Sequence, residues 1–331
     1  MKSTIQIFSE LGARLVGFGT DDVSRSVVAR AVAENEWFSV SDVRYAVEAV
    51  RREMLDAEKV AEWLTHYPAI GSRDARRVAI IMAGNIPLVG IFDLLCVIAS
   101  GDIPFVKPSS KDRVLEEYVE QLLCEIEPTL RIEKYEEDAE YDAIIATGGE
   151  SANLYFRTTF EGVSCLLRGS RHSVGVLSGG ESEEDIWALA DDIFTYSGLG
   201  CRSVSLVFVP KGYKLSLPVR NMCRAYHNNY LQCRALLTMQ GVEFEDLEEA
   251  VVVAQSKAEF PRFLSQINVV EYSDLRDVQQ WLAENEDALQ CVVSHIEGLH
   301  SRCVPLGQAQ YPTLYDYADE RDTMQFLASI D

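Results

Sequence analysis

The chain has 331 residues, of which 47% are hydrophobic and 25% charged, a balance typical of a globular protein with a substantial core. Its formal net charge of −22 disfavours nucleic acid and anionic membrane surfaces, which are bound by basic patches. We therefore expect no nucleic-acid partner, and the length favours two domains.

Targeting and metal-binding signals are absent from the sequence. No apolar run reaches the roughly 18 residues needed to span a bilayer, and the run from Ile86 to Ala99 is interrupted, which predicts a buried loop and helix. The eight cysteines form no CxxC pair and no metal-like grouping with the five histidines. We expect no metal site, reduced thiols and a cytoplasmic location.

The first 70 residues are predicted to be helical. Over residues 41–54, apolar side chains at Val43, Ala46, Val47 and Val50 recur with the helical period, and Ser41 is the predicted N-cap.

From residue 77 onward, strands alternate with helices. Strands are predicted at 78–83, 103–107 and 141–146, and helices ending at 100 and spanning 111–125 and 150–160. This alternation predicts an α/β fold with a doubly wound parallel sheet, whose ligands lie at the carboxyl ends of the strands. Asn85, Lys107 and the Gly148-Gly149 pair directly follow such ends.

A second α/β lobe is predicted in the remaining sequence. Short strands at 163–167 and 173–177 precede a helix at 181–194 and a strand ending at Pro210. The other predicted elements are helices at 217–226, through the 230s, at 274–285 and at 322–330, and strands at 251–254, 269–272 and 291–294.

Cys201 lies between that helix and the strand ending at Pro210, in a segment with Gly198 and Gly200. The glycines leave room for a substrate to approach the sulfur, so a nucleophilic role is one interpretation. The other is a small apolar residue that fills the core, as many cysteines do.

The residues at the strand ends have two interpretations each. Asn85 either donates a hydrogen bond to an oxyanion or holds a turn before Pro87. Lys107 either reaches a ribose or phosphate or is an exposed strand-end lysine. Thr147-Gly148-Gly149 either directs backbone N–H groups at a phosphate or forms an ordinary turn before a helix.

Taken in order, these motifs resemble those of the aldehyde dehydrogenase superfamily. The resemblance implies that Asn85 stabilises the oxyanion, that Lys107, Ser109 and Ser110 lie at the cofactor's adenosine ribose, and that Cys201 is the nucleophile. It places Thr147, Gly148 and Gly149 beside the cofactor's phosphates.

A closer resemblance is to the bioluminescence-type (LuxC-like) fatty acyl-CoA reductases. It rests on Ala83-Gly-Asn-Ile-Pro-Leu88, on Leu166-Leu-Arg-Gly-Ser-Arg-His-Ser-Val174, and on the tail motifs 307–312 and 322–327. It implies NADPH-dependent reduction of an acyl-CoA or acyl-protein thioester to a fatty aldehyde through an acyl-cysteine. The implied architecture has a cofactor-binding domain over 1–172, rejoined by 301–331, a catalytic domain over 173–300, and the active site in the cleft between them.

Two departures from ordinary aldehyde dehydrogenases refine this expectation. Leu167 stands where those enzymes carry the glutamate that activates water, which disfavours hydrolysis of the acyl-enzyme. Ser110 replaces a glutamate that would repel a 2′-phosphate, and Lys111 adds a nearby positive charge, so NADPH is favoured while NADH remains possible.

Other charged positions are weaker candidates. Arg168, Arg171 and His172 are expected in ion pairs or at the surface more than at a phosphate, and Glu259, beside Phe260, is expected at the surface. Three alternative functions stay open: a CoA-acylating or oxidative aldehyde dehydrogenase, a non-catalytic protein that binds an acyl-transfer partner, and an unrelated nucleotide-binding α/β protein. A homo-oligomer is compatible with each.

Overall fold

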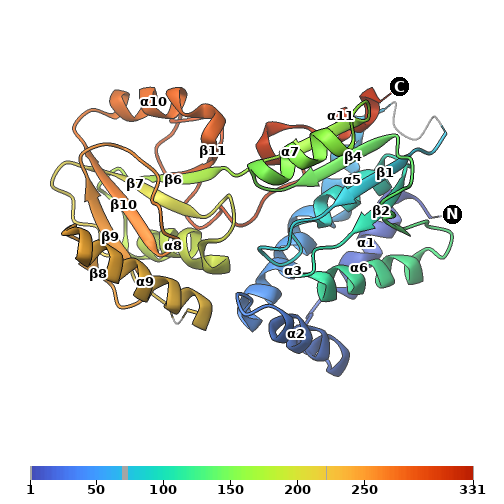
Figure 1. Ribbon diagram of the computed structural model, residues 1–331, viewed down its shortest axis with the longest axis horizontal. Coiled ribbons are helices and arrows are strands. Elements are labelled where there is room, and N and C mark those ends of the chain that lie inside the picture. The colour runs from blue at the N-terminus through green and yellow to red at the C-terminus, as the bar shows by residue number, and fades with distance from the viewer. Residues whose placement is uncertain (1, 69–73, 221, 331) are drawn as a thin grey trace. The chain divides into compact units, whose positions relative to one another are not determined.

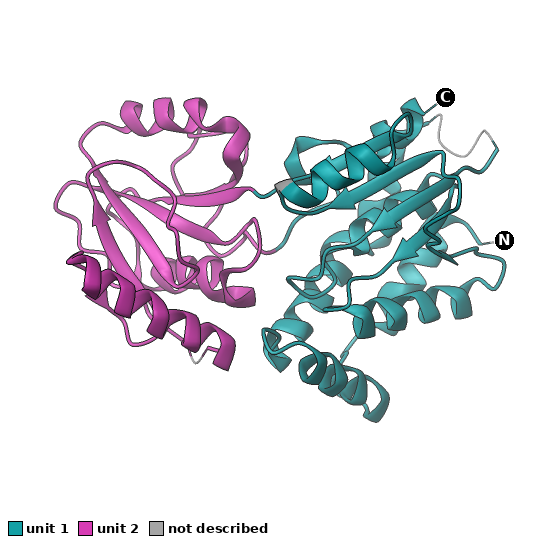
Figure 2. Ribbon diagram, in the orientation of Figure 1, with its two compact units in different colours: residues 1–170, 311–331 teal, residues 171–310 magenta. Residues whose placement is uncertain are grey.

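The computed structural model describes residues 2–68, 74–220 and 222–330, and it divides into two compact units (Figure 2). Unit 1 comprises residues 1–170 and 311–331, and unit 2 comprises residues 171–310. No helix in the described ranges has both the length and the apolar character of a membrane span.

Unit 1 begins with four helices, which confirms the predicted helical region apart from positions 69 and 70, which lie outside the described residues. They are α1 (Thr4–Arg14), α2 (Asp22–Glu34), α3 (Val40–Met54) and α4 (Ala57–Thr65). The predicted apolar stripe of α3 is buried.

The predicted N-cap of α3 is wrong by two residues. Ser39, not Ser41, caps the helix, because its hydroxyl oxygen accepts the N–H of Asp42 at 3.0 Å. Ser39 also donates to the Asp42 carboxylate at 2.7 Å, an acidic first-turn contact that Ser41 would lack.

The sheet of unit 1 is parallel throughout and has the order β3-β2-β1-β4-β5, which confirms the predicted doubly wound arrangement (Figure 1). Its strands are β1 (Arg77–Ile81), β2 (Ile103–Lys107), β3 (Glu133–Lys134), β4 (Ala143–Thr147) and β5 (Ser164–Arg168). The accompanying helices are α5 (Ile91–Ala99), α6 (Arg113–Ile126), α7 (Glu150–Thr159), η3 (Ala318–Glu320) and α11 (Thr323–Ser329).

Both faces of this sheet are covered. Along β1, Val78 and Ile80 belong to the large core formed with the N-terminal helices, whereas Ala79 belongs to a smaller cluster that includes Phe156 of α7. Burial on both faces explains why the strand sequences are continuously apolar rather than alternating.

Unit 2 contains a seven-stranded sheet of order β12-β11-β6-β7-β10-β9-β8, in which only the β8–β9 pair is antiparallel. Its strands are β6 (His172–Val176), β7 (Val204–Pro210), β8 (Glu245–Asp246), β9 (Val251–Gln255), β10 (Gln266–Tyr272), β11 (Leu289–Val293) and β12 (Cys303–Val304). Its helices are α8 (Glu183–Phe194), η1 (Thr195–Gly198), α9 (Arg224–Gln240), α10 (Leu275–Glu284) and η2 (Glu286–Ala288).

The helix predicted at 217–226 is wrong over its described first part; position 221 lies outside the described residues. Residues 217–220 are not helical, and α9 begins only at Arg224, after Cys223 at its N-cap, and continues unbroken to Gln240. Pro218 disfavours the helical region at the residue before it, Leu217. The apolar residues Leu215 and Leu217 are buried from an irregular segment instead.

Candidate active site

Three of the predicted motifs lie at one edge of the sheet in unit 1. Strand β1 pairs in parallel with β2 and with β4, so the carboxyl ends of the three strands share an edge. Lys107 is the last residue of β2, Thr147 is the last residue of β4, and Asn85 follows the end of β1 by a short loop. The predicted positions at strand ends are therefore confirmed.

The loop that carries Asn85 packs tightly against the loop after β2. A Cβ atom at Gly84 would lie 2.4 Å from the Ser109 hydroxyl oxygen and 3.2 Å from the backbone nitrogen of Asp112. Only glycine permits this approach. The asparagine loop (residues 82–90) and the serine loop (residues 108–112) are consequently fixed against each other.

A buried carboxylate ties the same two loops together. Asp112 is 2% exposed, and its Oδ2 accepts the backbone N–H of Leu88 at 2.6 Å. Leu88 has a φ of 56°, a left-handed conformation that leucine adopts only under constraint. Burial raises the pKa of Asp112 to about 8. The sequence reasoning missed this residue, because an aspartate before a helix is ordinarily interpreted as a helix cap, and Asp112 makes no capping bond to α6.

Lys107 and the serines beside it remain accessible. The ammonium of Lys107 lies 5.1 Å from the centre of the Tyr135 ring, a cation–π contact that orients an otherwise exposed side chain. The hydroxyl of Ser109 accepts the N–H of Lys111 at 3.3 Å, and Ser110 is exposed. These groups can meet a ribose or a phosphate without rearrangement of the core.

The turn between β4 and α7 leaves open space at the start of the helix. Gly149 is the N-cap of α7 and provides no side-chain cap, and a Cβ atom at this position would meet no atom within 4 Å. The N–H of Gly148 is bonded to the carbonyl of Arg168 at 3.1 Å, which fixes the turn. The first turn of α7 can therefore receive an anionic group, as helix N-termini commonly do.

Arg168 does not face this open space as a phosphate ligand. Its side chain is 4% exposed, pairs with the carboxylate of Asp93 at 2.5 Å, and donates to the hydroxyl of Thr323 at 2.6 Å. It therefore joins β5 to α5 and to the C-terminal helix of unit 1. Removing one partner of such a buried pair typically costs about 3–5 kcal/mol.

The remaining charged candidates also have structural contacts. Arg171 donates to the carbonyl of Leu289 at 2.9 Å, and the His172 ring stacks on Phe260 at 4.2 Å. Glu259 is exposed.

Leu167, which the resemblance aligns with the water-activating glutamate, is buried in the apolar cluster of β1 and β4. This position therefore supplies no group to activate water.

In unit 2, Cys201 follows an unusual left-handed turn. Tyr196, Ser197 and Gly198 have φ values of 57°, 55° and 67°. Left-handed conformations at non-glycine residues cost about 1–3 kcal/mol each and persist where surrounding contacts enforce them, often at functional sites. Both non-glycine side chains of this turn are buried.

Cys201 itself is exposed, so the core-filling interpretation of this cysteine is wrong. Its backbone carbonyl accepts the hydroxyl of Ser173 at 2.8 Å, and Ser203 N–H bonds to the carbonyl of Gly200 at 3.0 Å as the chain enters β7. The thiol turn (residues 195–203) thus presents a cysteine on a backbone fixed from both sides, between a helix and a strand as predicted.

A second buried carboxylate supports the thiol turn. Asp192 on α8 is 1% exposed and accepts the N–H groups of Gly307 at 2.6 Å and Ala309 at 2.9 Å. Burial raises the pKa of Asp192 to about 7. Arg202, the residue after Cys201, donates from its side chain to the backbone carbonyl of Ala309. Segment 307–310 is therefore bonded both to the helix before the thiol turn and to the turn itself.

The sequence did not lead us to predict a role for Asp192, although its position on a helix indicates one. It falls among the buried residues Leu189, Ala190, Ile193 and Phe194 on the apolar face of α8. A charged residue on such a face requires hydrogen-bond partners.

The structure thus groups Asn85, Lys107, Ser109 and Gly149 at one sheet edge of unit 1, whereas Cys201 belongs to unit 2.

Comparison with a family model gives one match. The model of the acyl-CoA reductase (LuxC) family matches residues 47–225, a stretch that contains Asn85, Lys107, Gly148 and Cys201. A search of curated proteins finds no match.

Solved structures of aldehyde dehydrogenases share the fold. Aldehyde dehydrogenase 21 from Physcomitrella patens matches with a TM-score of 0.69 at 10% identity, covering 98% of this chain and 83% of its own. A propionaldehyde dehydrogenase from a Clostridium phytofermentans microcompartment matches with a TM-score of 0.58 at 12% identity, covering 89% and 78%. An aldehyde dehydrogenase from Bacillus cereus, solved with NAD+, gives 0.60 at 13% identity over 89% and 72%. The fold is aldehyde dehydrogenase-like.

Proposed function

Since the chain belongs to the acyl-CoA reductase (LuxC) family and is an oxidoreductase of acyl groups, we propose that it reduces an acyl thioester to an aldehyde with NADPH. The acyl group is carried on Cys201 between the two half-reactions. The observation that carries this proposal is the exposed thiol of Cys201 three residues after a constrained left-handed turn, within the segment that the family model matches.

In the first half-reaction the Cys201 thiolate attacks the carbonyl carbon of the thioester. The side-chain amide of Asn85 and the backbone N–H of Cys201 donate to the tetrahedral oxyanion, each contributing about 3 kcal/mol in comparable oxyanion holes. The C–S bond to the carrier then breaks, and the carrier sulfur leaves with the electron pair and takes a proton. The products are an acyl-cysteine and a free carrier thiol, either CoA or a partner protein.

In the second half-reaction the acyl carbon is reduced. A nicotinamide cofactor, held by Lys107 and the first turn of α7, would supply the hydride, and the Asn85 amide and the Cys201 N–H would hold the oxyanion that results. Collapse of this thiohemiacetal expels the Cys201 thiolate and releases the aldehyde. The net reaction converts an acyl thioester, NADPH and one proton to an aldehyde, a thiol and NADP+.

The residues of unit 1 are suited to the cofactor. Open space at Gly149, beside the first turn of α7, accommodates a pyrophosphate, and the oriented ammonium of Lys107 serves the adenosine ribose. Ser109 and Thr147 lie at the same sheet edge. Ser110 is exposed beside Lys111 and carries no negative charge that would repel a 2′-phosphate, which favours NADPH over NADH.

Leu167 accounts for the preference for reduction over hydrolysis. A buried leucine at this position provides no general base, so the acyl-cysteine persists until hydride or a thiol arrives. We expect acid release to be much slower than aldehyde formation.

The test separates the two half-reactions. Incubation with acyl-CoAs from C2 to C16, followed by intact-protein mass spectrometry, should give a gain of one acyl group that Cys201→Ala abolishes. The matched control is Cys124→Ala, which removes another exposed cysteine and should acylate normally. NADPH oxidation should fall at least ~10³-fold in Cys201→Ala, given the dependence of covalent catalysis on its nucleophile. Acyl-dependent NADPH consumption that survives in Cys201→Ala would refute the mechanism.

A further inference from the structure

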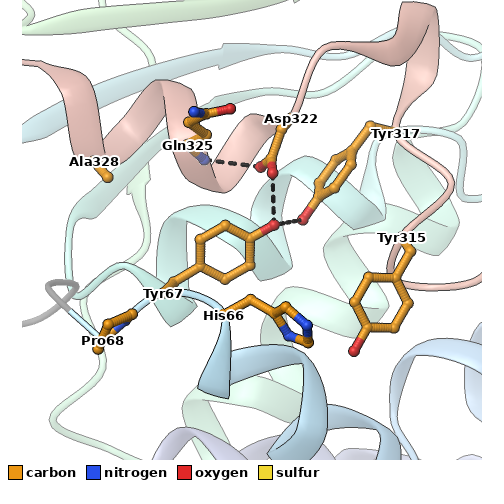
Figure 3. A pocket seen from close by; sticks show the side chains of 8 residues that line it. All are labelled: His66, Tyr67, Pro68, Tyr315, Tyr317, Asp322, Gln325 and Ala328. Carbon is orange, nitrogen blue, oxygen red and sulfur yellow. Dashed lines mark hydrogen bonds between the residues drawn. The ribbon is translucent and has the colours of Figure 1, made fainter.

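A cavity in unit 1, between the end of α4 and the C-terminal segment, is lined by aromatic rings and one carboxylate (Figure 3). It has a volume of about 540 Å³, within the range of small-molecule sites. The C-terminal end of α4 supplies His66 and Tyr67, and the C-terminal segment supplies Tyr315, Tyr317 and Asp322.

The hydroxyl groups in this cavity form an ordered chain that ends on the carboxylate. The indole N–H of Trp63 donates to the Tyr317 hydroxyl at 2.8 Å, and the Tyr317 and Tyr67 oxygens lie 2.6 Å apart. The Tyr67 hydroxyl donates to Asp322 Oδ2 at 2.6 Å. Because Tyr67 donates its only hydroxyl hydrogen to Asp322, Tyr317 must be the donor in the hydrogen bond between the two tyrosine oxygens (Figure 3).

Every hydroxyl hydrogen in this hydrogen-bonded series is thus already donated within it, so the groups that remain for a ligand are hydrogen-bond acceptors. The second carboxylate oxygen of Asp322 accepts the backbone N–H of Gln325 at 2.8 Å, which fixes its orientation and still leaves lone pairs. Burial raises the pKa of Tyr67 and of Tyr317, so both phenols stay neutral. Neither supplies a positive charge to Asp322.

The rim adds aromatic surface and no strong cation. The rings of His66 and Tyr315 meet edge to face with centroids 5.5 Å apart, and Tyr315 is 47% exposed. Among the described residues that line the cavity, none is lysine or arginine. Aromatic faces beside a fixed carboxylate attract cations and repel anions.

We propose that this cavity binds a primary ammonium group, R–NH3+, whose hydrogens are donated to Asp322 and the tyrosine oxygens while its alkyl chain contacts Tyr315 and His66. The group belongs either to a free alkyl diamine or to a lysine side chain of another protein. This inference is independent of the acyl-transfer chemistry.

The probe is n-butylammonium, with n-butanol and butyrate as neutral and anionic counterparts of the same chain length. The indole ¹H–¹⁵N signal of Trp63, one of four tryptophans, reports on the hydroxyl chain and is assigned with Trp63→Phe. Butylammonium should shift this signal saturably, and butanol and butyrate should not. Saturation by either counterpart with equal affinity would overturn the proposal, as would the absence of saturation by any amine.

Asp322→Asn is the decisive variant. Asparagine is an equally good N-cap for α11, and its single amide oxygen can keep the bond from the Gln325 N–H, while its NH2 group takes the place of the oxygen that accepts from Tyr67. The variant therefore removes the charge together with one acceptor. Binding of butylammonium should weaken at least tenfold in Asp322→Asn and about threefold in Tyr315→Leu. The control is Glu320→Gln, which alters a carboxylate outside the cavity lining and should bind butylammonium within twofold of the unaltered chain. Equal affinity in Asp322→Asn would overturn the proposal.

Two further ligands identify the source of the ammonium. Tighter binding of 1,4-diaminobutane assigns the cavity to free amines, and tighter binding of Nα-acetyl-lysine N-methylamide assigns it to a protein side chain.

Discussion

The asparagine loop of unit 1 and the thiol turn of unit 2 both adjoin buried parallel strands, yet they are held in place by different means. The asparagine loop relies on neighbours close in the chain: Gly84 packs on Ser109, and Asp112 accepts the N–H of Leu88. The thiol turn relies on residues more than 100 positions away, through the bonds of Asp192 and Arg202 to segment 307–310.

Because the two regions are held differently, substitutions at different places in the chain should disturb each of them. The asparagine loop is fixed by steric contact and one buried acid, so substitutions within residues 82–112 should disturb it. The thiol turn adopts a costly left-handed backbone, and hydrogen bonds to segment 307–310 hold the residues on both sides of it. Changes in α8 or in segment 307–310 should therefore reach Cys201 without altering the turn's own sequence.

After Cys201→Ala, the largest expected effect comes from Asn85→Ala. Both half-reactions pass through an oxyanion, so loss of the amide donor should lower kcat by ~10²–10³-fold. Single-turnover acylation of Cys201 by acyl-CoA, followed by mass spectrometry, should slow by a similar factor. Asn285→Ala, at the C-cap of α10, is the matched control and should leave both rates unchanged. A loss below tenfold in Asn85→Ala would remove this residue from the proposed oxyanion hole.

Asp192→Ala tests the distant support of the thiol turn. It leaves the N–H groups of Gly307 and Ala309 without their acceptor, which should lower the free energy of unfolding by about 2–4 kcal/mol. The folded fraction should also acylate Cys201 more slowly. Asp191→Ala, the adjacent and more exposed aspartate, should cost under about 1 kcal/mol. Normal acylation of folded Asp192→Ala would show that the turn keeps its shape without this support.

The sequence predicted unit 1 well because its sheet is encoded locally. Each of the four longer strands is a short apolar run bounded by proline, glycine or charge, and the crossover helices α5 and α6 have buried apolar faces of their own. The error at 217–226 arose because Leu215 and Leu217 are buried from an irregular segment, and apolar spacing alone cannot distinguish such a segment from a helix. Strands of two residues, such as β3 and β8, carry too little pattern to detect.

The motifs of the candidate site could be predicted from the sequence, but the buried residues that hold its loops in place could not. Asn85, Lys107 and Gly148-Gly149 lie at strand ends as expected, because parallel topology places those ends at one edge. Asp112 and Asp192 were missed because their role depends on burial and on partners that only the fold brings close. The left-handed conformation of Tyr196 and Ser197 also has no sequence signal, since neither residue type favours it.

The buried acid of the asparagine loop should make stability depend on pH. Burial raises the pKa of Asp112 from 3.8 to about 8, so the folded chain keeps a proton that the unfolded chain releases. Its contribution to stability is present below pH ~4 and is lost as the pH rises to about 8. Over this window the free energy of unfolding should fall by up to ~1.4 kcal/mol per pH unit relative to Asp112→Asn. Urea titrations of both chains at each pH measure this difference.

The smallest expected effect concerns Lys107, and it distinguishes the two regions most cleanly. Lys107→Met keeps the alkyl stem and removes the charge, so the dissociation constants of NADPH and NADH should both rise about tenfold, the size of one charge-assisted hydrogen bond. Lys111→Met should weaken NADPH more than NADH, because its proposed role concerns the 2′-phosphate alone. Acylation of Cys201 without cofactor should be unchanged in both variants. Fluorescence titration with each nucleotide and single-turnover mass spectrometry provide the two readouts. Slower acylation in Lys107→Met would contradict the assignment of this sheet edge to cofactor binding, because a residue that acts only on the nucleotide has no effect before the nucleotide is bound.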